Sequence, residues 1–114
     1  MLNENIFLKI ANKQIKANII YEDDQCLAFH DINPQAPVHV LIIPFKEIRT
    51  HADLKPEDQL LLGHIHLVAV QLAEQLGLSE GYRVVVNFKE RAGQTVPHLH
   101  FHLLGGRALG WPPG

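Results

Sequence analysis

Hydrophobic residues recur along this chain with two different periods, and these periods predict two helices and five strands. The longest helical pattern covers residues 54–77, with Pro56 suited to its first turn and Gly77 to its end. A shorter helical pattern covers residues 5–13. Runs rich in β-branched and aromatic residues predict strands at 17–22, 25–31, 38–43, 82–88 and 95–104. Because the helices and strands are segregated along the chain, we expect an α+β fold, a sheet with helices packed on it.

The long predicted helix is apolar on more than one side. Leu61, Ile65 and Val68 belong to one stripe, whereas Leu60 and Leu67 lie outside it. The whole chain, residues 1–114, has the length of a single domain, whose own core is modest. We therefore expect the second apolar side of the helix to pack against another copy of the chain.

Composition and charge exclude several classes of partner. Ten Lys and Arg against twelve Asp and Glu give a formal net charge of −2, and the basic residues form no stripe, so we expect no nucleic-acid polymer as a partner. The most apolar window, residues 60–73, is too short for a bilayer, so no membrane helix is expected. Cys26 is the single cysteine, and the N-terminal residues lack the pattern of a signal peptide. These features predict a cytoplasmic protein.

Three of the eight histidines alternate with hydrophobic residues near the C-terminus. They are His98, His100 and His102. Because a strand sends successive side chains to opposite faces, the alternation predicts one face of histidines and one face of core residues. A strand that merely shows polar residues to solvent explains one histidine better than three at strict spacing.

One interpretation of this pattern is a metal site, since imidazole is a common ligand of zinc. On a straight strand, residues four apart are separated by roughly 13 Å. Two imidazoles that share one zinc ion reach across only about 11 Å. His98 and His102 therefore cannot share an ion, and an adjacent pair together with His39 is the form of metal site that stays open.

A second interpretation is nucleophilic catalysis by a neutral imidazole on a phosphorus atom. A histidine with a pKa of about 6.5 is mostly neutral at pH 7. The stretch Gly93, Gln94 and Thr95 comes just before the histidines and offers backbone N–H groups and a hydroxyl, which suit a phosphate group.

The stretch from His98 to Leu104 resembles the signature of the histidine triad (HIT) superfamily, in which His and a hydrophobic residue alternate three times. Other parts of the chain look like the Hint branch of that superfamily. The similar stretches are residues 6–10, 20–24, 26–32, 34–37, 93–95, 105–107 and 111–114.

The resemblance implies a HIT-like fold, with a five-stranded antiparallel sheet, one long helix and one short helix. It implies a homodimer in which two such sheets join into a ten-stranded one. The implied activity is hydrolysis of purine nucleoside 5′-phosphoramidates, such as AMP linked to an amine or to lysine, through a covalent nucleotidyl-histidine. It needs no metal and no cofactor.

The resemblance also implies roles for individual residues. His100 is the nucleophile, and His98, His102 and His39 surround it. The Thr95 hydroxyl approaches the leaving amine. The groups that hold phosphate oxygens are Asn87, Gly93, Gln94 and Thr95, together with His100 and His102.

For the nucleoside, the resemblance assigns Asp31 to the ribose hydroxyls, which suits a carboxylate that accepts two hydrogen bonds. Trp111 would reach the site of the partner subunit. The residues implied around the purine are Ile6, Phe7, Ile10, Phe29, His30 and Ile32. For Ile6, Phe7 and Ile10, the helical spacing alone predicts a core face.

Alternatives remain open at this point. A dinucleoside polyphosphate hydrolase of the same superfamily and a nucleotide-binding or scaffold module without catalysis fit the same residues. Thr95 stands where many relatives have serine, and Pro97 removes a backbone donor just before the triad. We interpret His64 and His66 as core or interface groups, His51 as exposed, and Cys26 as a small core residue.

Overall fold

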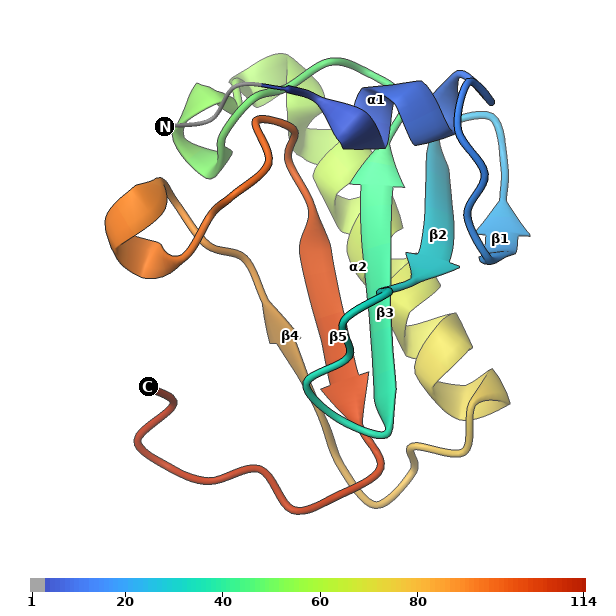
Figure 1. The fold of residues 1–114 in the computed structure, drawn as a ribbon, viewed down its shortest axis with the longest axis vertical. Helices are drawn as coiled ribbons and strands as arrows, with labels where there is room; N and C mark the ends of the chain where they lie inside the picture. Colours follow the sequence, from blue (N-terminus) through green and yellow to red (C-terminus); the bar gives the residue numbers. More distant parts are fainter. Residues whose placement is uncertain (1–3) are drawn as a thin grey trace.

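A computed structural model describes residues 4–114, which form one antiparallel sheet flanked by two helices (Figure 1). The strand order is β1-β2-β3-β5-β4. The strands are β1 (Ile19–Glu22), β2 (Cys26–His30), β3 (Val38–Pro44), β4 (Tyr82–Val85) and β5 (Phe101–Gly105). The helices are α1 (Ile6–Ala11) and α2 (Gln59–Gln75), with short 3-10 turns η1 (His51–Asp53), η2 (Pro56–Asp58) and η3 (Glu90–Ala92). The predicted α+β class and five-stranded antiparallel sheet are confirmed.

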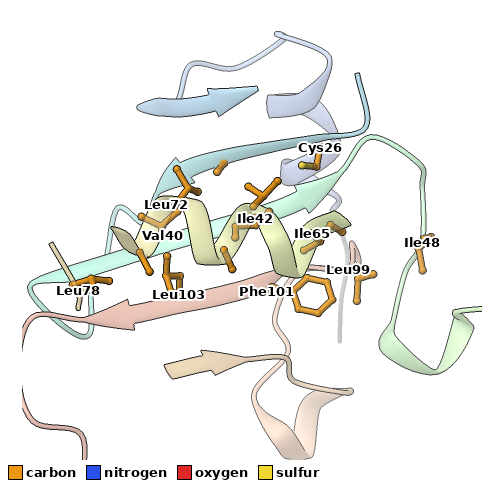
Figure 2. Packing of buried hydrophobic residues seen from close by; sticks show 14 residues of the cluster. Cys26, Val40, Ile42, Ile48, Ile65, Leu72, Leu78, Leu99, Phe101 and Leu103 are labelled. Atoms are coloured by element: carbon orange, nitrogen blue, oxygen red, sulfur yellow. The ribbon is translucent and has the colours of Figure 1, made fainter. Parts of the chain in front are cut away.

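The two helices cover opposite faces of the sheet, and each face has its own hydrophobic cluster. The larger cluster lies between α2 and the sheet and includes Ile42, Leu72 and Phe101 (Figure 2). The smaller cluster lies between α1 and strands β2 and β3 and includes Phe7 and Phe29. Burying one such side chain completely stabilises the fold by roughly 1.5–3 kcal/mol. The sheet is therefore held from both sides, more strongly from the α2 side.

The long helix has one buried and one exposed apolar face. Ile65, Val68 and Leu72 are buried against the sheet, as the predicted stripe requires. Leu60 and Leu67, which lie outside that stripe, are 87% and 69% exposed. The helix begins after the turn η2 rather than at residue 54, and Gly77, at a φ of 75°, follows its last turn. Within residues 4–114, neither helix is long and apolar enough to cross a membrane.

The last predicted strand is wrong in its first half. Instead of starting at residue 95, β5 begins at Phe101. Pro97 cannot donate to a ladder, and the N–H of Leu99 turns away to the carbonyl of Ile48. Only His102 of the triad thus lies on a strand, and His98 and His100 belong to the irregular segment before it. The face assignment of the hydrophobic residues is confirmed, since Leu99, Phe101 and Leu103 all lie in the α2 cluster.

The register of the central strands brings two distant histidines together. β3 and β5 are antiparallel neighbours, with Leu41 opposite His102 and His39 opposite Leu104. His39 and His102 are therefore diagonal neighbours on the α1 face of the sheet.

Candidate active site

Three histidine rings meet on the α1 face of the sheet. The rings of His100 and His102 are 5.0 Å apart between centroids, and those of His102 and His39 are 5.1 Å apart. His39 comes from β3, His102 from β5 and His100 from the segment just before β5. The structure thus brings together three of the four histidines that the sequence analysis placed in the site, and the fourth, His98, lies behind them.

A chain of hydrogen bonds fixes which nitrogens of His39 and His102 carry hydrogen. The backbone N–H of Gln35 donates to Nδ1 of His39 at 3.0 Å. His39 must therefore carry its hydrogen on Nε2, which donates to Nδ1 of His102 at 2.8 Å. His102 then carries its hydrogen on Nε2. That atom is buried and has no hydrogen-bond partner within residues 4–114. This series of hydrogen bonds therefore ends at Nε2–H of His102, which can donate to an oxygen of a ligand.

His100 has the opposite tautomer. Its Nδ1 lies 2.6 Å from the carbonyl oxygen of His98, which can only accept, so Nδ1 carries the hydrogen. Nε2 of His100 is left with an unshared electron pair, and it makes no hydrogen bond within residues 4–114. Among the clustered histidines, this is the nitrogen that can act as a nucleophile.

His98 supports the site and does not face it. Its ring is fully buried, with Nε2 donating to the carbonyl of Pro44 at 2.8 Å. Nδ1 accepts from the side-chain amide of Asn5 at 3.0 Å. Both nitrogens are occupied, so His98 fixes the backbone carbonyl that orients His100. Sequence reasoning missed Asn5 in this role, because its helix-cap position explains it fully without any second contact.

Burial keeps all four histidines neutral at pH 7. It lowers the pKa of His39, His98 and His100. Burial, together with the rings of His100 and His39, lowers the pKa of His102 to about 4. A neutral His100 keeps its electron pair for attack on an electrophile.

Asp31 lies at the edge of the histidine cluster, directly after β2. One carboxylate oxygen, Oδ2, is 3.5 Å from Nε2 of His39. The other, Oδ1, accepts from the N–H of Asn33 at 2.8 Å. The carboxylate is thus fixed by its own loop and partly exposed, and its expected contact with ribose hydroxyls stays a prediction.

The loop before the triad offers fewer backbone donors than its sequence suggests. The N–H of Gly93 donates to Glu90, and that of Gln94 donates to Lys89. The side-chain amide of Gln94, also buried, holds the carbonyls of Arg49 and Val96. These bonds leave the N–H and hydroxyl of the exposed Thr95 and the amide of Asn87 without hydrogen bonds inside residues 4–114, as the phosphate ligands this loop can supply.

The residues expected around a purine fall into two groups. Phe7, Ile10 and Phe29 are buried in the smaller cluster, as the helical spacing alone predicts. The ring of Phe7 also meets the His100 ring edge-on at 4.9 Å between centroids. The remaining residues are accessible: His30 is half-buried, Ile6 is exposed, and Ile32 is 99% exposed.

The other residues singled out from the sequence lie outside the histidine cluster. Trp111 is 83% exposed on the C-terminal tail. His64 of α2 lies 2.6 Å from a carboxylate oxygen of Asp23. His66 is exposed, so the core role is wrong for it, and a role at an interface stays a prediction. Cys26 is a fully buried core residue, as expected.

Two groups of side chains have the composition of a metal site. They are Asp31 with His39 and His102, and Asp23 with Cys26 and His64. In each group, the three possible ligand atoms lie within 4.8 Å of one another. In the first group, the two nitrogens share one hydrogen at 2.8 Å. In the second, the Asp23 carboxylate already accepts several hydrogen bonds, and burial and Asp23 raise the pKa of the Cys26 thiol to about 12. An ion would have to displace these bonds in either group.

Comparison with known proteins places this arrangement in a family. The chain matches the HIT domain model over residues 12–109. It is 54% identical over 114 residues to an uncharacterized HIT-like protein of Synechococcus elongatus, with both chains fully covered. A HIT family hydrolase from Legionella pneumophila superposes with a TM-score of 0.95 at 49% identity, covering 97% of this chain and 100% of that one. A histidine triad protein from Clostridium difficile superposes with a TM-score of 0.88 at 42% identity, covering 92% of each chain. With a matched model over most of its length and relatives this similar, the chain belongs to the HIT domain family.

Proposed function

We propose that this protein hydrolyses the P–N bond of purine nucleoside 5′-phosphoramidates, with His100 as the nucleophile. One observation carries the proposal: the ring of His100, whose Nε2 has a free electron pair, lies next to the ring of His102, whose buried Nε2–H has no partner within residues 4–114. A nucleophile and a donor for a phosphate oxygen are the two groups that such a reaction requires. The similar Legionella protein is described as a hydrolase, which supports the class of reaction.

The reaction takes two steps. In the first, the electron pair on Nε2 of His100 attacks phosphorus, a bond from this nitrogen to phosphorus forms, and the bond to the amine breaks. The leaving nitrogen takes up a proton from solvent, and we assign the exposed Thr95 hydroxyl to contact it. In the second step, water attacks the same phosphorus, the bond to His100 breaks, and the water proton is released. The sum is phosphoramidate plus water giving nucleoside monophosphate plus amine.

The neighbouring groups act on charge and orientation. The His98 carbonyl holds Nδ1–H of His100, so the developing imidazolium is stabilised at 2.6 Å without moving the ring. Nε2–H of His102 donates to the phosphate. Because Gln35 and His39 fix that tautomer, the donor is in place before substrate arrives. We assign Asp31 to the ribose hydroxyls.

A homodimer is part of the proposal. The exposed side chains of Leu60, Leu67 and Val70 form an apolar surface on α2, and β4 is an edge strand of the sheet. Pairing two β4 edges would give a ten-stranded sheet and cover both features. Trp111, on the exposed tail, would then be near the second subunit. Sedimentation showing a stable monomer at micromolar concentration would overturn the dimer without touching the chemistry.

The remaining parts of the proposal concern ligand and location. The ligands are a purine nucleoside monophosphate and its phosphoramidates, with no metal ion or cofactor assigned a step. A single buried cysteine suits a reducing compartment, and we place the activity in the cytoplasm.

The test is intact-protein mass spectrometry after wild type and His100→Ala are mixed with an adenosine 5′-phosphoramidate and quenched in acid. We expect an adenylate adduct and AMP release from wild type, and neither from the variant. Near-wild-type AMP release by His100→Ala would refute the proposal. A dinucleoside polyphosphate in a parallel reaction shows which bond is preferred, and faster cleavage of that compound would reassign the substrate class.

A further inference from the structure

A cavity lies beside the loop that precedes the triad, and none of the clustered histidines lines it. It has a volume of about 620 Å³, and Phe88 and Pro97 supply rings to its wall. Arg49, Lys89 and Arg91 also line it, from two loops that are far apart in the sequence. The volume is in the range of small-molecule sites.

The cavity has an excess of positive charge. Its charged residues are Arg49, Lys89 and Arg91 against Glu90. All three cations are exposed, and none forms an ion pair with a carboxylate of residues 4–114. The Lys89 ammonium lies 5.1 Å from the centre of the Phe88 ring. An apolar wall with cations at its rim suits an organic anion.

Hydrogen bonds from Gln94 hold the two sides of this cavity against the catalytic loop. The backbone N–H of Lys89 donates to Oε1 of Gln94 at 2.9 Å. Nε2 of Gln94 donates to the carbonyl of Arg49 at 2.8 Å. Lys89 keeps a φ of 65°, which non-glycine residues rarely adopt, so its position is imposed by these contacts. Thr95, the next residue, carries the hydroxyl assigned to the leaving amine.

We infer that this cavity receives the leaving group of the substrate and selects amines that carry a carboxylate. The inference rests on the proposed function, because it deepens the same reaction. The adenylate part would occupy the histidine side of the loop, and the amine would point past Thr95 toward Pro97 and the three cations. Amines derived from acidic amino acids are the chemical class that fits this charge.

The test compares three adenosine 5′-phosphoramidates linked through the same α-nitrogen: those of glutamate, of its neutral diamide and of lysine amide. In wild type we expect kcat/KM to fall from the anionic to the neutral to the cationic leaving group. An exposed ion pair changes binding by about two- to fivefold, so Arg49→Gln with Arg91→Gln should lower the glutamate-to-diamide ratio by about tenfold. Raising the salt from about 0.01 M to about 0.5 M should reduce the same ratio in wild type.

Lys16→Gln is the matched control, because Lys16 is an exposed lysine on the segment before β1, distant in sequence from both cavity loops. It removes one positive charge and should leave the ratio unchanged. Hydrolysis of the diamide with a ratio that the double variant does not change would overturn the inference and leave the proposed function intact. Hydrolysis of none of the three compounds would overturn both.

Discussion

The two faces of the sheet are lined by alternate residues of one segment, residues 99–103, and they have opposite chemistry. Leu99, Phe101 and Leu103 point toward α2 into a wholly hydrophobic cluster. His100 and His102, one position away, are also largely shielded but carry polar nitrogens. The α2 face tolerates burial because nothing there needs a partner. The α1 face tolerates it because four of the six nitrogens of the three facing rings have partners. The backbone of Gln35 and of His98 binds one nitrogen each, and Nε2 of His39 binds Nδ1 of His102. The two that remain are the ones that chemistry requires.

The largest effect on stability is expected from Phe101→Ala. Phe101 is 2% exposed and packs in the α2 cluster, so its removal leaves a cavity between α2 and the sheet. We expect a loss of about 3–5 kcal/mol in the free energy of unfolding. Urea unfolding followed by circular dichroism measures it.

Phe7→Ala is the matched change on the other face. Phe7 comes from a helix of only six residues and packs in the smaller cluster. A smaller stability loss together with lower kcat/KM is expected, because its ring edge supports His100. Equal stability losses with unchanged activity would break the contrast between the faces.

The next effect is a loss of stability in acid that comes from the α1 face. Histidines of the unfolded chain take up protons near pH 6.5. The buried histidines of the folded chain take them up only at lower pH, and the pKa of His102 is about 4. The stabilisation is therefore fully present above pH 6.5 and is lost as the pH falls toward 4. Each unmatched proton contributes a slope of about 1.4 kcal/mol per pH unit.

Urea unfolding at several values between pH 7.5 and pH 4.5 tests this slope. Asp31, His39 and His100 are the titratable groups around His102. His102→Gln removes one titrating group and should flatten the curve by about one proton's slope. A free energy of unfolding that does not change over this pH window would show that the rings are not held neutral.

The hydrophobic period of the sequence predicted the regular elements of this structure, but it did not predict the side-chain contacts between residues far apart in the chain. Alternation identified the core residues Leu99, Phe101 and Leu103, and the strand pattern placed His39 in β3. It could not show that Asn5 reaches His98, 93 positions away, or that the Pro44 carbonyl holds the same ring. Such partners are backbone groups or ordinary cap residues, and they leave no pattern.

The predicted start of the last strand failed for a related reason. Alternation continues through His98 and His100, although the backbone there no longer pairs as a strand. The alternation of side chains therefore predicted which residues share a face, whereas local hydrogen bonds determined the backbone conformation of those residues. Gln94 is a second example of a contact that the sequence pattern does not reveal. Its side-chain amide holds a loop whose backbone N–H groups were expected to be free for a phosphate.

Asn5→Ala sharpens the view that distant contacts hold the α1 face. It removes the cap on the N–H of Leu8 and leaves Nδ1 of His98 buried without a donor. We expect a loss of about 1–2 kcal/mol, together with a fall in kcat.

Asn5→Asp separates these two roles. Aspartate can cap the helix but cannot donate to Nδ1 of His98, so stability should recover in part while kcat stays low. Thermal unfolding and AMP release measured on both variants decide the point. Full recovery of kcat in Asn5→Asp would mean that the bond to His98 has no part in orienting His100.

The smallest effect concerns the polar contact on the α2 side. His64 lies against Asp23, which also accepts from the Tyr21 hydroxyl at 2.6 Å. This contact joins the β1–β2 turn to α2 at the rim of the hydrophobic cluster, and it is partly exposed. We expect His64→Ala to cost about 0.5–1 kcal/mol in urea unfolding, since partly exposed pairs are weak. We expect kcat/KM to remain at the wild-type value, because no hydrogen bond connects the pair to the histidine cluster within residues 4–114.

Tyr21→Phe, which removes only one donor from the same carboxylate, should lower the free energy of unfolding by less. A loss of activity in either variant would show that the α2 face takes part in the chemistry, and the division between the two faces would then be structural only.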